Sequence, residues 1–77
     1  MFLTNLITRF AVMSSNLRAV GYDSGSQTLE IEFRNGGAYA YYGVSPWVHA
    51  ALMTASSHGK YFHSHIRGKY EYRRLPS

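Results

Sequence analysis

Basic and aromatic side chains gather in the last quarter of this 77-residue chain, which has a net charge of +4. From residue 58 onward, five cations stand against a single acid, Glu71. The cations are Lys60, Arg67, Lys69, Arg73 and Arg74. Tyr61, Tyr70 and Tyr72 lie among them. Cationic side chains neutralise phosphates, and aromatic rings stack on bases, so we expect RNA binding led by this region.

A second group of aromatic residues lies in "GGAYAYYGV", residues 36–44. Successive residues of a strand point to opposite faces, so Tyr39 and Tyr41 share one face and Tyr42 takes the other. These tyrosines are either packing residues of a small core or part of a binding surface. Buried tyrosines would still bring their hydroxyls to a polar rim.

The turn before this strand decides which of its faces is buried. A two-residue loop at residues 35–36 places Tyr39 and Tyr41 on the outer face. A three-residue loop at residues 35–37 shifts the register by one, which places both in the core and Tyr42 outside. We favour the three-residue loop, because so small a domain needs bulky core residues and the extra glycine allows a bulged turn.

Four histidines raise the question of a metal site. They are His49, His58, His63 and His65. On a helix, His63 and His65 lie about 200° apart and cannot bind one ion together, whereas on a strand they could. The chain has no cysteine. We expect no metal site and no cofactor.

Residues that could perform catalysis are sparse. The chain has four carboxylates, and Glu30 and Glu32 fall on the polar face of a predicted strand. A nuclease-like site can be drawn in "SSHGKYFHSH", but a serine that precedes a helix is more typical of a cap. We therefore expect a binding module, not an enzyme, and no small-molecule substrate.

The elements that must position these side chains follow from the hydrophobic pattern. Predicted strands cover residues 16–22, 28–34 and 38–44. In the middle one, "TLEIEFR", apolar and charged residues alternate, as in a half-buried antiparallel strand. Asn35-Gly36 is a strong hairpin signal.

Helical signals follow the third strand. Ser45-Pro46 suits the start of a helix, and Ser56 or Ser57 suits the start of a second one, which Gly68 would end. The predicted fold class is α+β, a three-stranded antiparallel β-meander followed by two short helices. The tail, residues 69–77, would add a short edge strand or lie extended over the sheet.

The first thirteen residues are predicted to be an amphipathic extension of a single domain at residues 14–77. Their apolar residues recur at helical spacing, and they are Phe2, Leu3, Leu6, Ile7 and Phe10. We expect a helix that covers part of the core. The alternatives are a helix for self-association or for a membrane surface, or an extension before a domain that starts at Met13.

Two further features concern the cellular compartment. No apolar run approaches the ~20 residues that span a bilayer, and Arg9 interrupts the apolar residues where a signal peptide would need them. Because cysteine is absent, a reducing cytosol is the expected location.

Several short motifs occur in a familiar order. They are "SS" before the first strand, "VGYD", "LEIEF", "YAY", "VSPWV", "SHGKYF" and "HIRGKY". Over residues 14–75 the chain resembles the KTSC domain, a module named for the C-terminus of some lysyl-tRNA synthetases that also occurs as stand-alone bacterial and phage proteins.

The resemblance implies a role in RNA binding, which has been proposed for the family, and no catalytic residue. That role would fall on Tyr39 and Tyr41 of the central motif. The "GKYF" and "HIRGKY" motifs would add Lys60, Tyr61, Arg67 and Lys69. The competing function is a protein-interaction module that docks on a larger enzyme, in which an aromatic such as Trp47 would serve as a hot spot.

Overall fold

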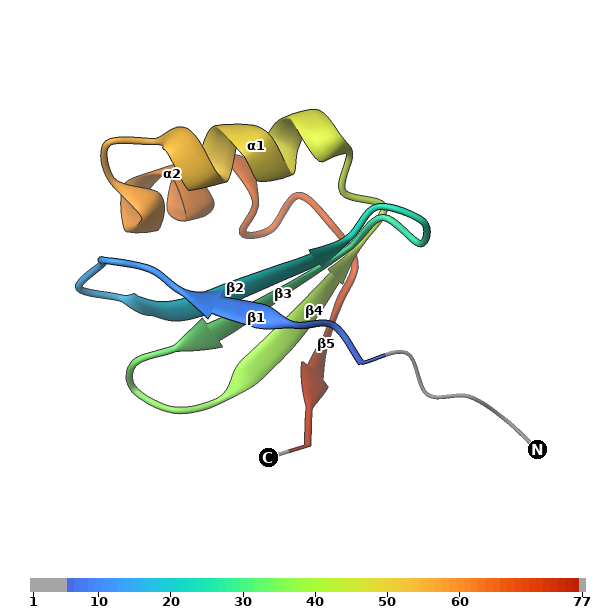
Figure 1. The fold of residues 1–77 in the computed structure, drawn as a ribbon, viewed down its shortest axis with the longest axis horizontal. Coiled ribbons are helices and arrows are strands. Elements are labelled where there is room, and N and C mark those ends of the chain that lie inside the picture. The colour runs from blue at the N-terminus through green and yellow to red at the C-terminus, as the bar shows by residue number, and fades with distance from the viewer. Residues whose placement is uncertain (1–5, 77) are drawn as a thin grey trace.

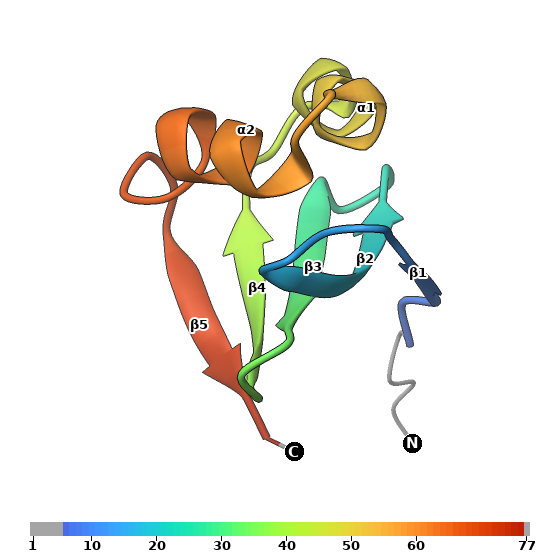
Figure 2. The same cartoon turned by 90° about the vertical axis from the view of Figure 1, so that its left-hand side faces the viewer.

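The computed structural model describes residues 6–76, which form a five-stranded antiparallel sheet with two helices over one face (Figure 1). The elements are β1 (Arg9–Ala11), β2 (Leu17–Asp23), β3 (Thr28–Phe33), β4 (Ala38–Tyr42), α1 (Pro46–Thr54), α2 (His58–His65) and β5 (Tyr72–Leu75). The strands lie in the order β1-β2-β3-β4-β5. After α2 the chain returns to the sheet, so that β5 lies beside β4 (Figure 2).

The predicted α+β class with an antiparallel sheet and two helices is confirmed, but the number of strands was wrong. The sheet has five strands, not three, because a short strand pairs with each edge of the central meander. At one edge, β5 realises the edge strand that was one of the two alternatives for the tail. It follows the two helices in the chain, whereas the other four strands precede them.

At the other edge of the sheet, the prediction of a helix in the N-terminal extension is wrong for Arg9–Ala11, which form the strand β1. A single short amphipathic helix is marginal in water, whereas pairing with β2 satisfies backbone groups along an open edge. Gly21 permits the close approach, since a Cβ atom there would lie 2.6 Å from the Thr8 carbonyl oxygen. Residues 1–5 of the expected helix lie outside the described residues.

The β3–β4 hairpin settles which face the tyrosines occupy. Ile31 pairs with Tyr39 and Leu29 pairs with Tyr41, so both tyrosines lie on the core face, as favoured from the sequence. The loop that produces this register differs from the expected one. The Phe33 N–H donates to the Gly37 carbonyl at 3.0 Å, which leaves residues 34–36 as the loop. The expected loop and the observed loop both have three residues, so both place Tyr39 and Tyr41 on the core face.

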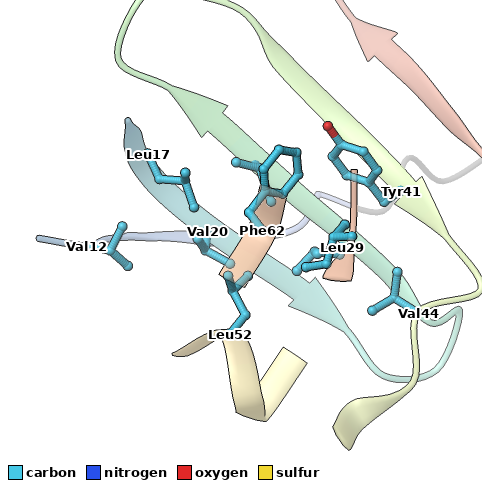
Figure 3. Close-up of a cluster of buried hydrophobic side chains, with 10 residues drawn as sticks. Val12, Leu17, Val20, Leu29, Tyr41, Val44, Leu52 and Phe62 are labelled. Carbon is cyan, nitrogen blue, oxygen red and sulfur yellow. The ribbon is translucent and has the colours of Figure 1, made fainter. Parts of the chain in front are cut away.

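The core lies between this face and the two helices (Figure 3). Side chains from the sheet, among them Val20, Leu29 and Tyr41, meet Leu52 of α1 and Phe62 of α2. Burying an aliphatic side chain of this size contributes about 1.5–3 kcal/mol. The helices therefore attach to the sheet mainly through these contacts.

Both helices begin where the sequence predicted. The Ser45 hydroxyl accepts a hydrogen bond from the Val48 N–H, with Pro46 in the first turn. The Ser57 hydroxyl caps α2 by accepting from the Lys60 N–H. Between residues 6 and 76, neither helix has the length and apolar character needed to cross a membrane.

Candidate nucleic-acid interface

A groove runs along the core face of the sheet where α2 leaves that face uncovered. Figure 2 shows α2 above one end of β4, while β4 and β5 continue beyond the helix. The groove consists of two adjoining hollows. The larger hollow measures about 660 Å³ and is lined by Tyr39, Tyr41, Tyr72 and Arg74, among others. The smaller hollow measures about 270 Å³ and is lined by Ser15, Asn16, Arg34 and His63, among others. Both share Phe33, Asn35, Phe62 and Arg67.

Aromatic rings form the floor and one wall of the larger hollow. Tyr41 is only 6 % exposed and meets the ring of Phe62 edge-on, with ring centres 5.5 Å apart. Tyr72 lies directly opposite Tyr41 in the β4–β5 register, and its ring centre is 6.0 Å from those of Tyr39 and Tyr41. Since Tyr72 is 62 % exposed, its ring is the one most open to a ligand.

Two guanidinium groups flank these rings. The Arg74 Cζ atom lies 5.8 Å from the centre of the Tyr39 ring, because the two residues are register partners. Arg67 lines both hollows and donates from Nη1 to His63 Nδ1 at 3.4 Å. Within the described part of the chain, no acidic residue lines either hollow. The groove is therefore aromatic and cationic.

The acidic side chains of the sheet lie on its other face and are already paired. Arg9 contacts Glu30 at 2.9 Å and Glu32 at 3.5 Å, and Arg18 contacts Glu32 at 3.6 Å. Asp23 instead accepts hydrogen bonds from Ser26, which hold its pKa below the ordinary value. Within residues 6–76, no ion pair involves the five cations after residue 58, so their charge is available to an anion.

Burial controls the ionisation of the Tyr41 phenol, which lies at the floor of the larger hollow. Loss of hydration raises the pKa of Tyr41 to about 12, and the neighbouring Tyr39 and Tyr72 phenols act in the same direction. Arg67 opposes the shift, since its positive charge favours the phenolate. The Tyr41 hydroxyl therefore stays protonated near neutral pH and can donate a hydrogen bond.

The structure gathers half of the predicted binding residues into the groove, namely Tyr39, Tyr41, Arg67 and Arg74. The other four do not line it. Lys60 and Lys69 are exposed, Tyr61 stacks on His65 with ring centres 4.3 Å apart, and Arg73 pairs with Ala40 on the other face.

Among the lining residues that were not identified as site residues from the sequence, Phe33, Asn35 and Phe62 line both hollows. Phe33 carried a usable signal, because its parity in the predicted strand places it on the face of Tyr39. Tyr72 was named only among the tyrosines of the basic region. A prediction that the tail forms a strand would have placed Tyr72 and Arg74 on one face of the sheet and Arg73 on the other.

The histidines do not assemble into a metal centre in the described region. His63 and His65 both lie on α2, and residues 6–76 contain no cluster of three or more His, Cys, Asp or Glu side chains that could hold an ion. His49 instead stacks on Tyr22, with ring centres 4.4 Å apart.

Comparisons with known proteins agree with this architecture. The family model described as the KTSC domain matches residues 13–70. The crystal structure of a KTSC domain protein from Yersinia pestis superposes with a TM-score of 0.90 at 38 % sequence identity, covering 92 % of this chain and 100 % of that one. An uncharacterized protein of Stutzerimonas stutzeri is 43 % identical over 87 % of this chain and 96 % of its own length.

A third relative is a much larger protein. The lysine–tRNA ligase of Trichormus variabilis is 41 % identical over 61 residues, which are 79 % of this chain but 11 % of the ligase. The likeness therefore concerns one small segment of that enzyme.

Proposed function

This chain belongs to the KTSC domain family, and on that basis we propose that it is a non-catalytic RNA-binding module that acts in the cytosol. The observation that carries the proposal is the composition of the groove. Exposed and half-buried aromatic rings lie beside Arg67 and Arg74, without an acidic residue among the described lining residues. Rings that stack on bases and cations that bind phosphates are the two requirements for holding a single strand.

The relatives favour RNA over other polyanions. One of them is a lysine–tRNA ligase, whose name identifies tRNA as its substrate, and a segment of that ligase resembles this chain. A module that occurs both within such an enzyme and in small proteins is well suited to an RNA task that the two share. Because the likeness covers 11 % of the enzyme, the proposal concerns RNA binding and not the ligase activity.

The proposed roles divide according to position. Arg67 and Arg74 would bind phosphates within the groove, and Tyr39 and Tyr72 would stack on bases. Tyr41 would support the floor and donate from its hydroxyl. The predicted phosphate contacts Lys60, Lys69 and Arg73, with Tyr61, lie outside the groove and would act on RNA that extends beyond it.

Titration with mixed single-stranded RNA over a range of salt concentrations tests the proposal. Log affinity should fall linearly with log salt, with a slope of about −0.7 for each phosphate bound. The double variant Arg67→Ala/Arg74→Ala should flatten the slope by about two such units. Arg18→Ala is the control, because Arg18 is a cation on the other face that pairs with Glu32. Binding no tighter than that of an unrelated protein of similar charge would refute the proposal.

A separate observation supports a second candidate function. Trp47 at the start of α1 is 79 % exposed and lines neither hollow, and exposed tryptophans are common at protein hot spots. A protein-docking module would use this surface. Pull-down from lysate before and after nuclease treatment distinguishes the two functions. A partner that is retained after nuclease and lost in Trp47→Ala would favour docking.

A further inference from the structure

We propose that the groove binds two consecutive unpaired nucleotides, with Arg67 at the phosphate that joins them. This inference rests on the proposed RNA-binding function and adds the length and the strandedness of the ligand. It is carried by the division of the groove into two hollows that share one cationic residue.

The position of Arg67 defines the register of the ligand. It lines both hollows, and no other cationic residue does so within the described chain. Neighbouring nucleotides in RNA are joined by a single phosphate. When each hollow holds one nucleotide, that phosphate falls at the boundary, where a guanidinium can bind it with two parallel hydrogen bonds.

The larger hollow suits a base. Its volume of about 660 Å³ falls within the range of pockets that hold small ligands. The exposed Tyr72 ring offers a stacking surface, and Arg74, whose Cζ atom lies 5.8 Å from the centre of the Tyr39 ring, provides a second cation. A base in this hollow would stack on Tyr72 while its ribose points toward Arg67.

The smaller hollow suits a more polar group. Its volume is about 270 Å³, and the amides of Asn16 and Asn35 line it. An amide side chain both donates and accepts, as recognition of ribose hydroxyls and base edges requires. Arg34 stands at this hollow and is held by a hydrogen bond from its Nε to the Ser14 carbonyl. It would bind the next phosphate along the strand.

The depth of the rings explains why the nucleotides must be unpaired. Tyr41 and Phe62 are nearly fully buried, and Tyr39 is half-buried beneath Arg74. In a duplex the base faces are covered by their neighbours, so they cannot enter a hollow of this kind. A duplex would reach only the outer cations.

The length of the ligand is tested with uridine monophosphate, the dinucleotide UpU and longer oligouridylates at low salt. UpU should bind about tenfold more tightly than the mononucleotide, because it adds a second base while still carrying one phosphate. Further nucleotides should add progressively less. Arg67→Ala should weaken the binding of UpU and of the mononucleotide alike, because it removes the phosphate contact that both ligands make, whereas Arg18→Ala should change neither affinity.

Strandedness is tested with a blunt RNA duplex and either of its separate strands. The separate strand should bind about tenfold more tightly, and Tyr72→Ala should remove the difference. Equal binding of duplex and strand, or of UpU and the mononucleotide, would overturn this inference and leave RNA binding itself intact. If no RNA binds more tightly than it binds an unrelated basic protein, the proposed function fails as well.

Discussion

Arg74 in β5 lies over the ring of its register partner Tyr39 in β4, with 5.8 Å between Cζ and the ring centre. The two residues come from strands that the helices separate in the sequence. The contact fixes the guanidinium beside an aromatic surface, where a cation and a ring attract each other. In the proposed complex, a base and its phosphate would therefore be held at the same point.

The two adjacent arginines of β5 should differ in RNA binding. Arg74 lies in the groove, and Arg73 lies on the other face opposite Ala40. Arg74→Ala should flatten the salt dependence by about 0.7 units, and Arg73→Ala should change it by less than half as much. Both variants lose one positive charge, so equal effects would show that overall charge and not the groove determines binding.

Tyrosines on opposite faces provide a second comparison. Tyr72→Ala should cost about 1–3 kcal/mol in affinity for single-stranded RNA, with little change in salt dependence, because it removes a stacking surface but no charge. Tyr42→Ala should leave the affinity unchanged, since Tyr42 is exposed on the other face. Equilibrium titrations of both variants check this, and a loss in Tyr42→Ala would place the RNA elsewhere.

The buried phenol of Tyr41 predicts a loss of stability at high pH. Its pKa is about 12 in the folded protein against the ordinary 10.0, so between these values the unfolded chain loses a proton that the folded protein keeps. The contribution of Tyr41 is therefore fully present below pH 10.0 and is lost as the pH rises through about 12. Urea unfolding across this interval should show a smaller decline in Tyr41→Phe than in the parent, with Tyr42→Phe as the control.

His49 predicts a loss of stability at acidic pH. Burial lowers its pKa below the ordinary 6.5, because the imidazolium would lose hydration. The unfolded chain then binds a proton more readily, so stability is fully present above pH 6.5 and is lost as the pH falls through the folded value.

The variant His49→Phe isolates this effect, since it keeps a ring against Tyr22 but cannot titrate. Its free energy of unfolding should depend less on pH just below 6.5 than that of the parent. Asp23 loses its stabilising charge only at lower pH, because its pKa lies below the ordinary 3.8. Parallel pH profiles of the parent and the variant would argue against a contribution from His49.

The cap of α2 offers a matched pair of serines. Ser57→Ala should destabilise the protein by about 1 kcal/mol, because its hydroxyl accepts from the Lys60 N–H at 3.2 Å. Ser56→Ala should have a much smaller effect, since Ser56 is exposed and precedes the cap. Urea unfolding of the two variants tests the assignment. Equal effects would mean that the cap contributes nothing specific.

The sequence by itself was sufficient for the parts of the fold that depend on local chemistry. The alternation in "TLEIEFR" predicted β3, and the serine caps predicted the starts of both helices. For Tyr39 and Tyr41 the sequence left two loop lengths of opposite parity open, and the structure confirms the facing given by the favoured three-residue loop. The actual loop, residues 34–36, differs by one position yet has the same parity. The excess of basic residues after residue 58 was likewise visible in the sequence.

The tertiary structure alone decided the edges of the sheet and therefore the groove. A three- or four-residue edge strand carries too few residues for a period to be recognised, and it exists because a neighbouring strand offers unpaired backbone groups. The spacing of the apolar residues therefore predicted a helix over Arg9–Ala11, whereas in the folded protein these residues pair with β2. The groove needs β5 beside β4 and α2 above them, which brings Tyr39, Phe62 and Tyr72 together across long separations in sequence. No local pattern encodes those separations, because packing and strand pairing determine them only once the chain has folded.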